Sequence, residues 1–164
     1  MFGFLQVTTV ILIAVAMALA LAHALELPGK MRLSKEAYLA VQPIYYPGFT
    51  IGGGIGEGGG MIAILILLVF TPNASASFWW TLAAFLLLLI MHLTYWVVTH
   101  PVNRFWVKDI DLTGLGARFF ALFSPSGARG GADWSRLRDV WEYSHVARAV
   151  FAMLSLISLT IAII

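Results

Sequence analysis

The sequence predicts an all-α integral membrane protein, a single domain in which four spanning helices form a bundle. Of its 164 residues, 60% are hydrophobic and only 11% are charged, whereas a soluble domain carries about 25% charged residues. Four apolar stretches each approach the roughly 20 residues that a helix needs to cross the hydrocarbon core. Cysteine is absent, which excludes disulfides, thiolate metal sites and iron–sulfur clusters. Any cofactor must therefore be held by His, carboxylate, Tyr or Met side chains.

The first predicted span covers residues 4–25 and is expected to end before Pro28-Gly29, a pair that stops helices. The segment before it lacks the positive charge that opens a signal peptide, so we interpret the stretch as a retained span. A charged loop over residues 27–48 follows, in which Ser34 is placed to cap a short helix. The Tyr-Tyr pair near the end of this loop is typical of the lipid headgroup level.

The second predicted span covers residues 49–70, and its first half is rich in glycine around Glu57. Gly52, Gly56 and Gly60 form two overlapping GxxxG units, which allow membrane helices to approach closely. We expect this face to pack against another helix, which includes the option of a second copy of the chain or a partner membrane subunit. The glycines also leave room for a ligand around Glu57.

The third span is predicted over residues 78–99, and the fourth over residues 142–164. Between them, the loop 101–141 mixes basic and aromatic residues, which suits segments on a membrane surface and argues against a nucleic-acid partner. Asp133 is placed to cap a long final helix that enters the bilayer after two polar turns. The expected neighbours of the protein are therefore lipids and a lipophilic small molecule.

The distribution of positive charge predicts the orientation. All Lys and Arg residues lie at positions 30–35, 104–138 or 148, and lysine and arginine concentrate in cytoplasmic loops. Both charged loops are therefore predicted to be cytoplasmic, with the two termini outside. The corresponding location is the inner (plasma) membrane, as a multi-pass protein.

This orientation brings the rare ionisable side chains of all four spans to similar depths near the cytoplasmic face. Mixed imidazole and carboxylate ligands suit Fe, Mn, Zn or Cu. Soluble di-iron bundles place a Glu-x-x-His pair on each of two helices, a pattern that the first and fourth spans match in part. The candidate metal ligands are His23, Glu26, Glu57, His92, His100, Glu142 and His145.

Two alternatives to a non-haem metal stay open. Histidines on different spans bind b-type haem from both faces, and His23 with His92 or His100 would suit. Without any cofactor, His23, Glu57 and His145 form an acid–base set: a histidine takes a proton from an acidic C–H, and Glu57 holds the proton of the developing phenolate.

Several of the same charges also have purely structural interpretations. Glu26 can pair with Lys30 one helical turn later, and Glu142 can pair with Arg138. Arg148 either extends to the membrane surface or neutralises a buried acid.

Four short motifs are spread over the whole chain: LAHALELPGK at 21–30, QPIYYPG at 42–48, Pro101-x-Asn103, and Trp141-x-x-x-His145-x-x-Arg148. Together they resemble the anthrone-oxygenase-like family of small four-helix membrane proteins. The resemblance implies a four-helix membrane fold and, for named members, O2-dependent oxidation of anthrones to anthraquinones.

The sequence thus leads to two functional hypotheses. The first is a membrane oxidoreductase or oxygenase that acts on a lipophilic aromatic or quinone-like substrate, which enters between the spans at the cytoplasmic leaflet. The second is a non-catalytic membrane subunit or small carrier that binds metal, haem or a partner helix. The residues expected to line the pocket or hold a cofactor are Tyr45, Tyr46, His92, Trp96, His100, Trp141 and Arg148.

Overall fold

The computed structural model describes residues 2–107 and 133–164, and these residues form helices with no strand among them. Four of the helices are long and apolar enough to cross a membrane: Phe2–Lys30, Gly48–Phe70, Ala76–Asn103 and Trp134–Ile163. This confirms the all-α class and the expectation of four helices that could span a membrane. Residues 108–132 of the predicted loop 101–141 lie outside the described residues.

The first span, α1 (Phe2–Lys30), continues through Pro28, so the prediction that the helix stops there is wrong. A proline removes the hydrogen bond that its own N–H would donate, and the last turn of α1 tolerates this loss. The Met31 N–H still bonds to the Leu27 carbonyl at 3.0 Å, and the Lys30 side chain is held by carboxylates described below. Helix α1 therefore carries Lys30 into the protein interior, where it is 5% exposed.

A short helical linker follows α1. Helix α2 (Lys35–Val41) begins at the predicted cap, where the Ser34 side chain accepts a hydrogen bond from the Ala37 N–H. A single 3-10 turn, η1 (Gln42–Tyr45), leads to the second span. Burial of Tyr38 and Tyr45 against Trp106 and Trp141 ties this linker to the third and fourth spans.

The second span is built from α3 (Gly48–Gly53), the π-helical turn η2 (Gly54–Gly58) and α4 (Gly59–Phe70). Its GxxxG face packs against α1. A Cβ atom on Gly56 would lie 2.8 Å from the Ala16 backbone nitrogen, and one on Gly52 would lie 3.0 Å from Leu19 Cδ1. The close approach predicted for the GxxxG face is therefore present within the chain, between the second span and α1. This is the same face that was also considered, from the sequence, for contact with a partner subunit.

The third span consists of α5 (Ala76–Thr94), the π-helical turn η3 (Tyr95–Thr99) and α6 (His100–Val107). The fourth is the single helix α8 (Trp134–Ile163), whose N-cap is the predicted Asp133. Helices α5 and α8 pack along their length, and Ser155 of α8 donates a hydrogen bond to the Ala84 carbonyl of α5 at 2.8 Å.

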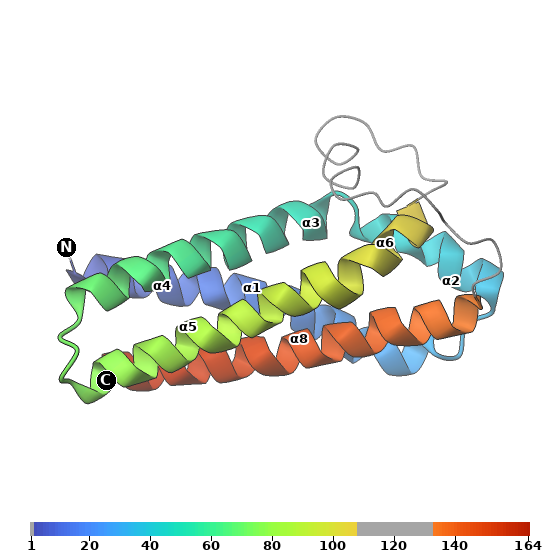
Figure 1. The fold of residues 1–164 in the computed structure, drawn as a ribbon. Helices are drawn as coiled ribbons and strands as arrows, with labels where there is room; N and C mark the ends of the chain where they lie inside the picture. Colours follow the sequence, from blue (N-terminus) through green and yellow to red (C-terminus); the bar gives the residue numbers. More distant parts are fainter. Residues whose placement is uncertain (1, 108–132) are drawn as a thin grey trace.

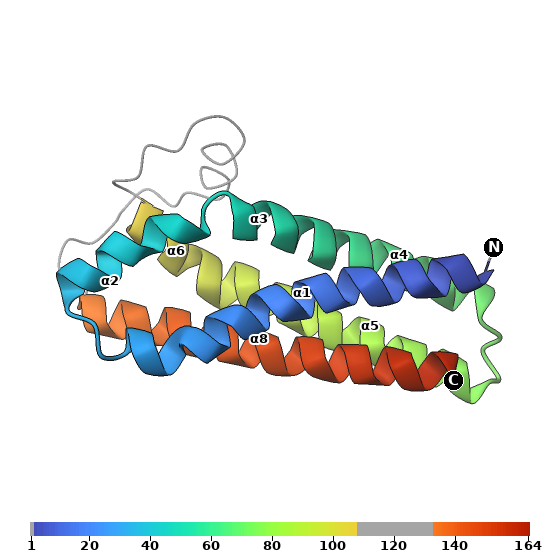
Figure 2. The same ribbon diagram turned by 180° about the vertical axis from the view of Figure 1, so that it is seen from behind.

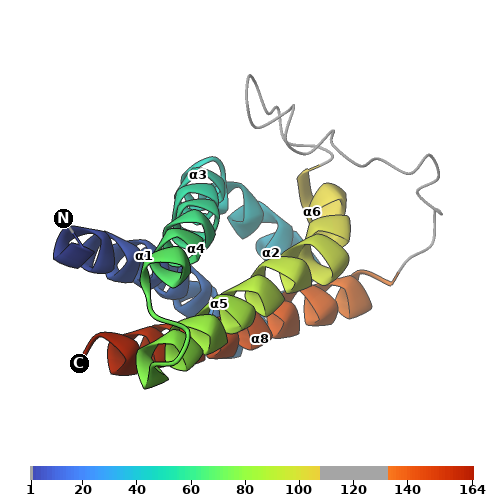
Figure 3. The same cartoon turned by 60° about the vertical axis from the view of Figure 1, so that its left-hand side comes forward.

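The spans run lengthwise beside one another, with both termini and the α4–α5 turn at one end and α2 and α6 at the other (Figures 1 and 2). The apolar core fills the half near the termini, where α1, α4, α5 and α8 meet around Ile13, Ile64, Leu88 and Leu159. In the other half, α3 packs against α1 and η1, whereas α4 is the part of the second span that packs against α5. Figure 3 shows α3 and α6 standing apart at that end.

Candidate functional site

A cavity of about 170 Å³ lies in the half of the molecule where α3 and α6 stand apart. All four spans and the segment between α2 and α3 contribute to its walls. Most of the site residues that were predicted from the sequence are among the ionisable and aromatic side chains that line this cavity. They include His23, Glu57, His92, Trp141, His145 and Arg148.

The rings of His23 and His145 face each other inside this cavity, with centroids 4.2 Å apart. The Nδ1 atom of His145 lies 2.9 Å from the Trp141 carbonyl oxygen. Because a carbonyl only accepts, Nδ1 must carry the proton in this bond. The Nε2 atom of a neutral His145 is then the nitrogen with the free lone pair, which is the form that a general base requires.

His23 is surrounded by aromatic rings. The centroids of Tyr45, Phe49 and Trp141 lie 4.6, 4.7 and 5.0 Å from that of the imidazole. Its Nδ1 atom is buried without a hydrogen-bond partner, and the nearest carboxylate oxygen, on Glu26, is 3.9 Å away. A ligand in the cavity is thus offered a buried polar atom in an otherwise apolar setting.

Glu57 and Arg148 form a buried ion pair, in which Arg148 Nη2 donates to Glu57 Oε1. Arg148 therefore neutralises a buried acid, as one of the two interpretations of the sequence proposed. Its guanidinium also lies 5.0 Å from the centre of the Tyr95 ring. The Nε atom of Arg148, a residue of the cavity lining, remains buried without a hydrogen-bond partner.

His92 completes this group, and its hydrogen bonds define its protonation. The Trp96 indole N–H donates to His92 Nε2 at 2.8 Å, so Nε2 carries no proton. The other nitrogen, Nδ1, lies 3.2 Å from Glu57 Oε2 and must donate to it. His92 is therefore neutral in this arrangement, and the ion pair of Glu57 is with Arg148 alone.

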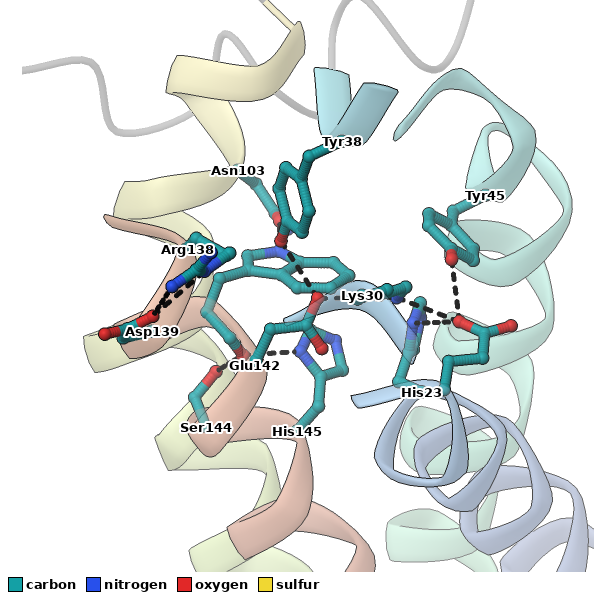
Figure 4. A network of polar contacts seen from close by, with 12 residues as sticks. His23, Lys30, Tyr38, Tyr45, Asn103, Arg138, Asp139, Glu142, Ser144 and His145 are labelled. Atoms are coloured by element: carbon teal, nitrogen blue, oxygen red, sulfur yellow. Dashed lines mark hydrogen bonds and ion pairs between the residues drawn. The ribbon is translucent and has the colours of Figure 1, made fainter. Parts of the chain in front are cut away.

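A second polar network closes the end of the cavity (Figure 4). The Lys30 ammonium lies 2.8 Å from Glu26 Oε2 and 3.6 Å from Glu142 Oε1, so it forms ion pairs with both carboxylates. It also lies 4.4 Å from the centre of the Tyr45 ring and 4.7 Å from that of Trp141. The cation is thus enclosed by two carboxylates and two aromatic faces.

Tyrosine hydroxyls complete this network. Tyr38 donates to Glu142 Oε1 at 2.9 Å and Tyr45 to Glu26 Oε2 at 2.7 Å. Burial and the neighbouring Glu142 carboxylate raise the pKa of Tyr38. Burial and the bond to Glu26 likewise raise the pKa of Tyr45, so both phenols stay protonated as donors.

The pairing of Glu142 differs from the sequence prediction. Glu142 pairs with Lys30, whereas Arg138 pairs with the adjacent Asp139 at 2.8 Å. The reason is that Glu142 is fully buried on the side of α8 that faces α1. The predicted pair of Glu26 with Lys30 is confirmed.

Three of the predicted site residues do not line the cavity: Glu26, His100 and Glu142. His100 is 2% exposed and packs against Trp96 and Tyr95, whose hydroxyl lies 3.4 Å from His100 Nδ1. Sequence reasoning also missed Tyr95 and a buried role for Lys30. Tyr95 carries a signal in hindsight, since it follows His92 by three residues and thus shares its side of the helix.

The described residues do not form a metal-ion site, and His92 is not available to a haem. Among them, no group of three or more His, Asp or Glu side chains is arranged to hold a metal. The carboxylates are engaged by cations, Glu57 by Arg148 and the other two by Lys30. Both ring nitrogens of His92 are occupied, which leaves no lone pair for haem iron. The predicted metal site is therefore without structural support.

Fold and site together define an α-helical protein with four candidate membrane spans and a partly open cavity of polar and aromatic residues at one end. The chain matches no protein-family model, and no match of significance was found with a curated protein or a solved structure.

Proposed function

We propose that this chain is an integral membrane oxidoreductase of the oxygenase-like kind, acting on a lipophilic aromatic or quinone-like substrate in the His23–His145 cavity. The observation that carries the proposal is that one small cavity is lined by both a proton acceptor and a hydrogen-bond donor. His145 offers an imidazole lone pair at Nε2, and Arg148 offers an unused N–H donor at Nε. Aromatic rings from η1, α3, η3 and α8 form much of the remaining walls, which suits a flat apolar ligand.

These groups support removal of a proton from an activated C–H of the substrate. His145 Nε2 accepts the proton, and the negative charge that develops is delocalised onto an oxygen substituent of the substrate's ring system. The Arg148 Nε–H stabilises that oxygen, because a donor aimed at developing charge in a site that excludes water is effective. Glu57, which the sequence placed in a proton-holding role, instead orients Arg148 through their ion pair.

The oxidant in this proposal is O2. Conversion of a ring CH2 to a carbonyl consumes one O2 and releases one water, which contains the two hydrogens removed from carbon. His145 returns the proton that it accepted, so the protein is unchanged after each turnover. This is the type of reaction that the anthrone-oxygenase-like resemblance implies, and it needs no metal.

The proposal includes a membrane topology. The four spans form a bundle in the plasma membrane with both termini outside, because the positively charged residues cluster in the loops after the first and third spans. The cavity then lies in the cytoplasmic half of the bilayer, within reach of a substrate dissolved in lipid.

The test is O2 uptake by the purified protein in lipid nanodiscs supplied with a tricyclic anthrone, corrected for uptake in empty nanodiscs. One O2 should be consumed per quinone formed. His145→Gln should lower the rate by about 100-fold or more without weakening binding of the quinone product. Tyr143→Phe, at an exposed position on the same helix, is the matched control and should keep full activity.

Two outcomes contradict the proposal in different ways. Binding of the anthrone and quinone without O2 uptake would indicate a non-catalytic carrier. No binding of either compound to the wild-type protein would exclude the cavity as a site for aromatic ligands.

A further inference from the structure

One side of the cavity is bounded by two rows of residues on the second and third spans. Thr50, Gly54 and Gly58 follow one another at intervals of four residues on α3 and η2, and His92 and Trp96 do so at the end of α5 and the start of η3. All five line the cavity. We call the space between the two rows the glycine slot.

The glycine row leaves the slot open. A Cβ atom added to Gly54 or Gly58 would meet no other atom within 4 Å, whereas one on Gly56 would lie 2.8 Å from a backbone nitrogen of α1. Gly56 thus lies on the face of the helix that packs against α1, whereas Gly54 and Gly58 lie on an open face. Gly54 is exposed and the His92 side chain is 28% exposed, so the cavity reaches the surface here.

The surface around the slot is apolar. Ile51 and Ile55 beside the glycine row are 53% and 60% exposed, and Leu93 and Val97 beside the other row are 49% and 72% exposed. Apolar side chains at these exposures on spanning helices face lipid tails. The slot therefore opens toward the bilayer.

The backbone in both walls is wound as a π-helix, η2 on one side and η3 on the other. Single π-helical turns within α-helices occur frequently at functional sites. Here α3 packs against α1 and η1, and the contact of the second span with α5 is made by α4.

Two residues that line the cavity each have a buried polar atom without a hydrogen-bond partner: His23 Nδ1 and Arg148 Nε. These residues are only 5% and 7% exposed. Buried donors and acceptors without a partner are costly, and a ligand oxygen that reaches them would remove this cost.

We propose that the glycine slot is the portal through which a flat, lipophilic ring system with an oxygen substituent passes from the bilayer into the cavity. This inference rests on the proposed function and specifies its substrate's shape and route. One wall of the slot is bare helix backbone at Gly54 and Gly58, and the other presents the imidazole of His92 and the indole of Trp96. A planar ring fits between such walls, whereas a branched ligand is excluded.

The test compares Gly54→Phe with Val97→Phe, which adds the same ring outside the slot. The probe is a hydroxyanthraquinone dissolved in the lipid of nanodiscs, and its binding is followed by quenching of tryptophan fluorescence after rapid mixing of two nanodisc populations. In Gly54→Phe the association and dissociation rate constants should both fall by about tenfold or more. Val97→Phe should behave as wild type.

A second measurement guards against misfolding. The chain has no cysteine, so Gly54→Cys provides a single thiol that can be alkylated with a bulky maleimide after binding of the probe has been verified. Alkylation should slow both rates, and alkylation of Val97→Cys should leave them unchanged.

The portal and the proposed function fail in distinguishable ways. If the wild-type protein binds the probe and the alkylated Gly54→Cys protein binds at the wild-type rate, the portal is excluded and the site stands. Faster dissociation of the probe from Gly54→Phe with an unchanged association rate would also exclude the portal. If the wild-type protein does not bind the probe, the proposed function itself is contradicted.

Discussion

Arg148 of α8 and Glu57 of η2 form a buried ion pair across the cavity, although they lie 91 positions apart in the sequence. They are 7% and 5% exposed. The neutral His92 donates a further hydrogen bond to the same carboxylate, so Glu57 accepts from two different spans. This arrangement joins the second, third and fourth spans around the site.

Removal of one partner of this pair should destabilise the protein strongly. Arg148→Met leaves the Glu57 carboxylate buried without its cation, and breaking such pairs costs about 3–5 kcal/mol. The double variant Glu57→Gln/Arg148→Met removes both charges and should recover much of this loss. The measurement is the free energy of unfolding by SDS in mixed micelles. Effects of the single variants that simply add in the double variant would contradict the interaction.

Gly56→Ala should destabilise the contact between the first two spans. Its Cβ atom would lie 2.8 Å from the Ala16 nitrogen and 3.1 Å from the Leu12 carbonyl oxygen, and backbone atoms cannot rotate away. Overpacking of this kind costs about 1–3 kcal/mol. The matched control is Gly58→Ala, where the added methyl meets no atom and helix propensity improves by up to about 1 kcal/mol. Equal destabilisation of both variants in SDS unfolding would argue against the α1–η2 packing.

Ser155→Ala should have a small but measurable effect on stability. It removes the hydrogen bond from Ser155 to the Ala84 carbonyl that connects α8 and α5. Hydrogen bonds between membrane helices contribute about 0.6 kcal/mol on average, and we expect a loss of that size. The control is Thr160→Val, because the Thr160 hydroxyl donates within its own helix, to the Leu156 carbonyl. A loss as large in the control would show that the interhelical bond is not the cause.

Spectrophotometric titration at alkaline pH should detect phenols that resist ionisation. Burial raises the pKa of Tyr38, Tyr45 and Tyr46, so these three of the five tyrosines should remain protonated at about pH 11 in the folded protein, above the ordinary tyrosine pKa of about 10. The unfolded chain loses these protons first, and stability should therefore fall as the pH rises above about 10.

The readout is the absorbance of tyrosinate. Tyr38→Phe and Tyr45→Phe should leave the early part of the titration curve unchanged and reduce only the part that accompanies unfolding. Complete ionisation of all tyrosines while the helical circular dichroism is intact would contradict the buried network.

The sequence predicted most of the residues that line the candidate site, but it did not predict which acidic residue pairs with which cation. His23, Glu57 and His145 stood out because ionisable residues in apolar spans are rare, and the structure places all three at one cavity. The metal expectation depended on free carboxylates. It finds no support among the described residues, because Arg148 and Lys30 occupy those carboxylates. The sequence contained both cations, and only the packing shows which acids they meet.

Local sequence by itself determined the class of fold, the four spans and the helix caps at Ser34 and Asp133, since these follow from apolar length and from bonds within a few residues. Tertiary structure decided the rest. Glu142 meets Lys30 of α1 although Arg138 lies one turn away on its own helix, because burial selects the partner that faces the interior. The same packing of spans makes one face of the glycine-rich helix a tight contact and leaves the other open.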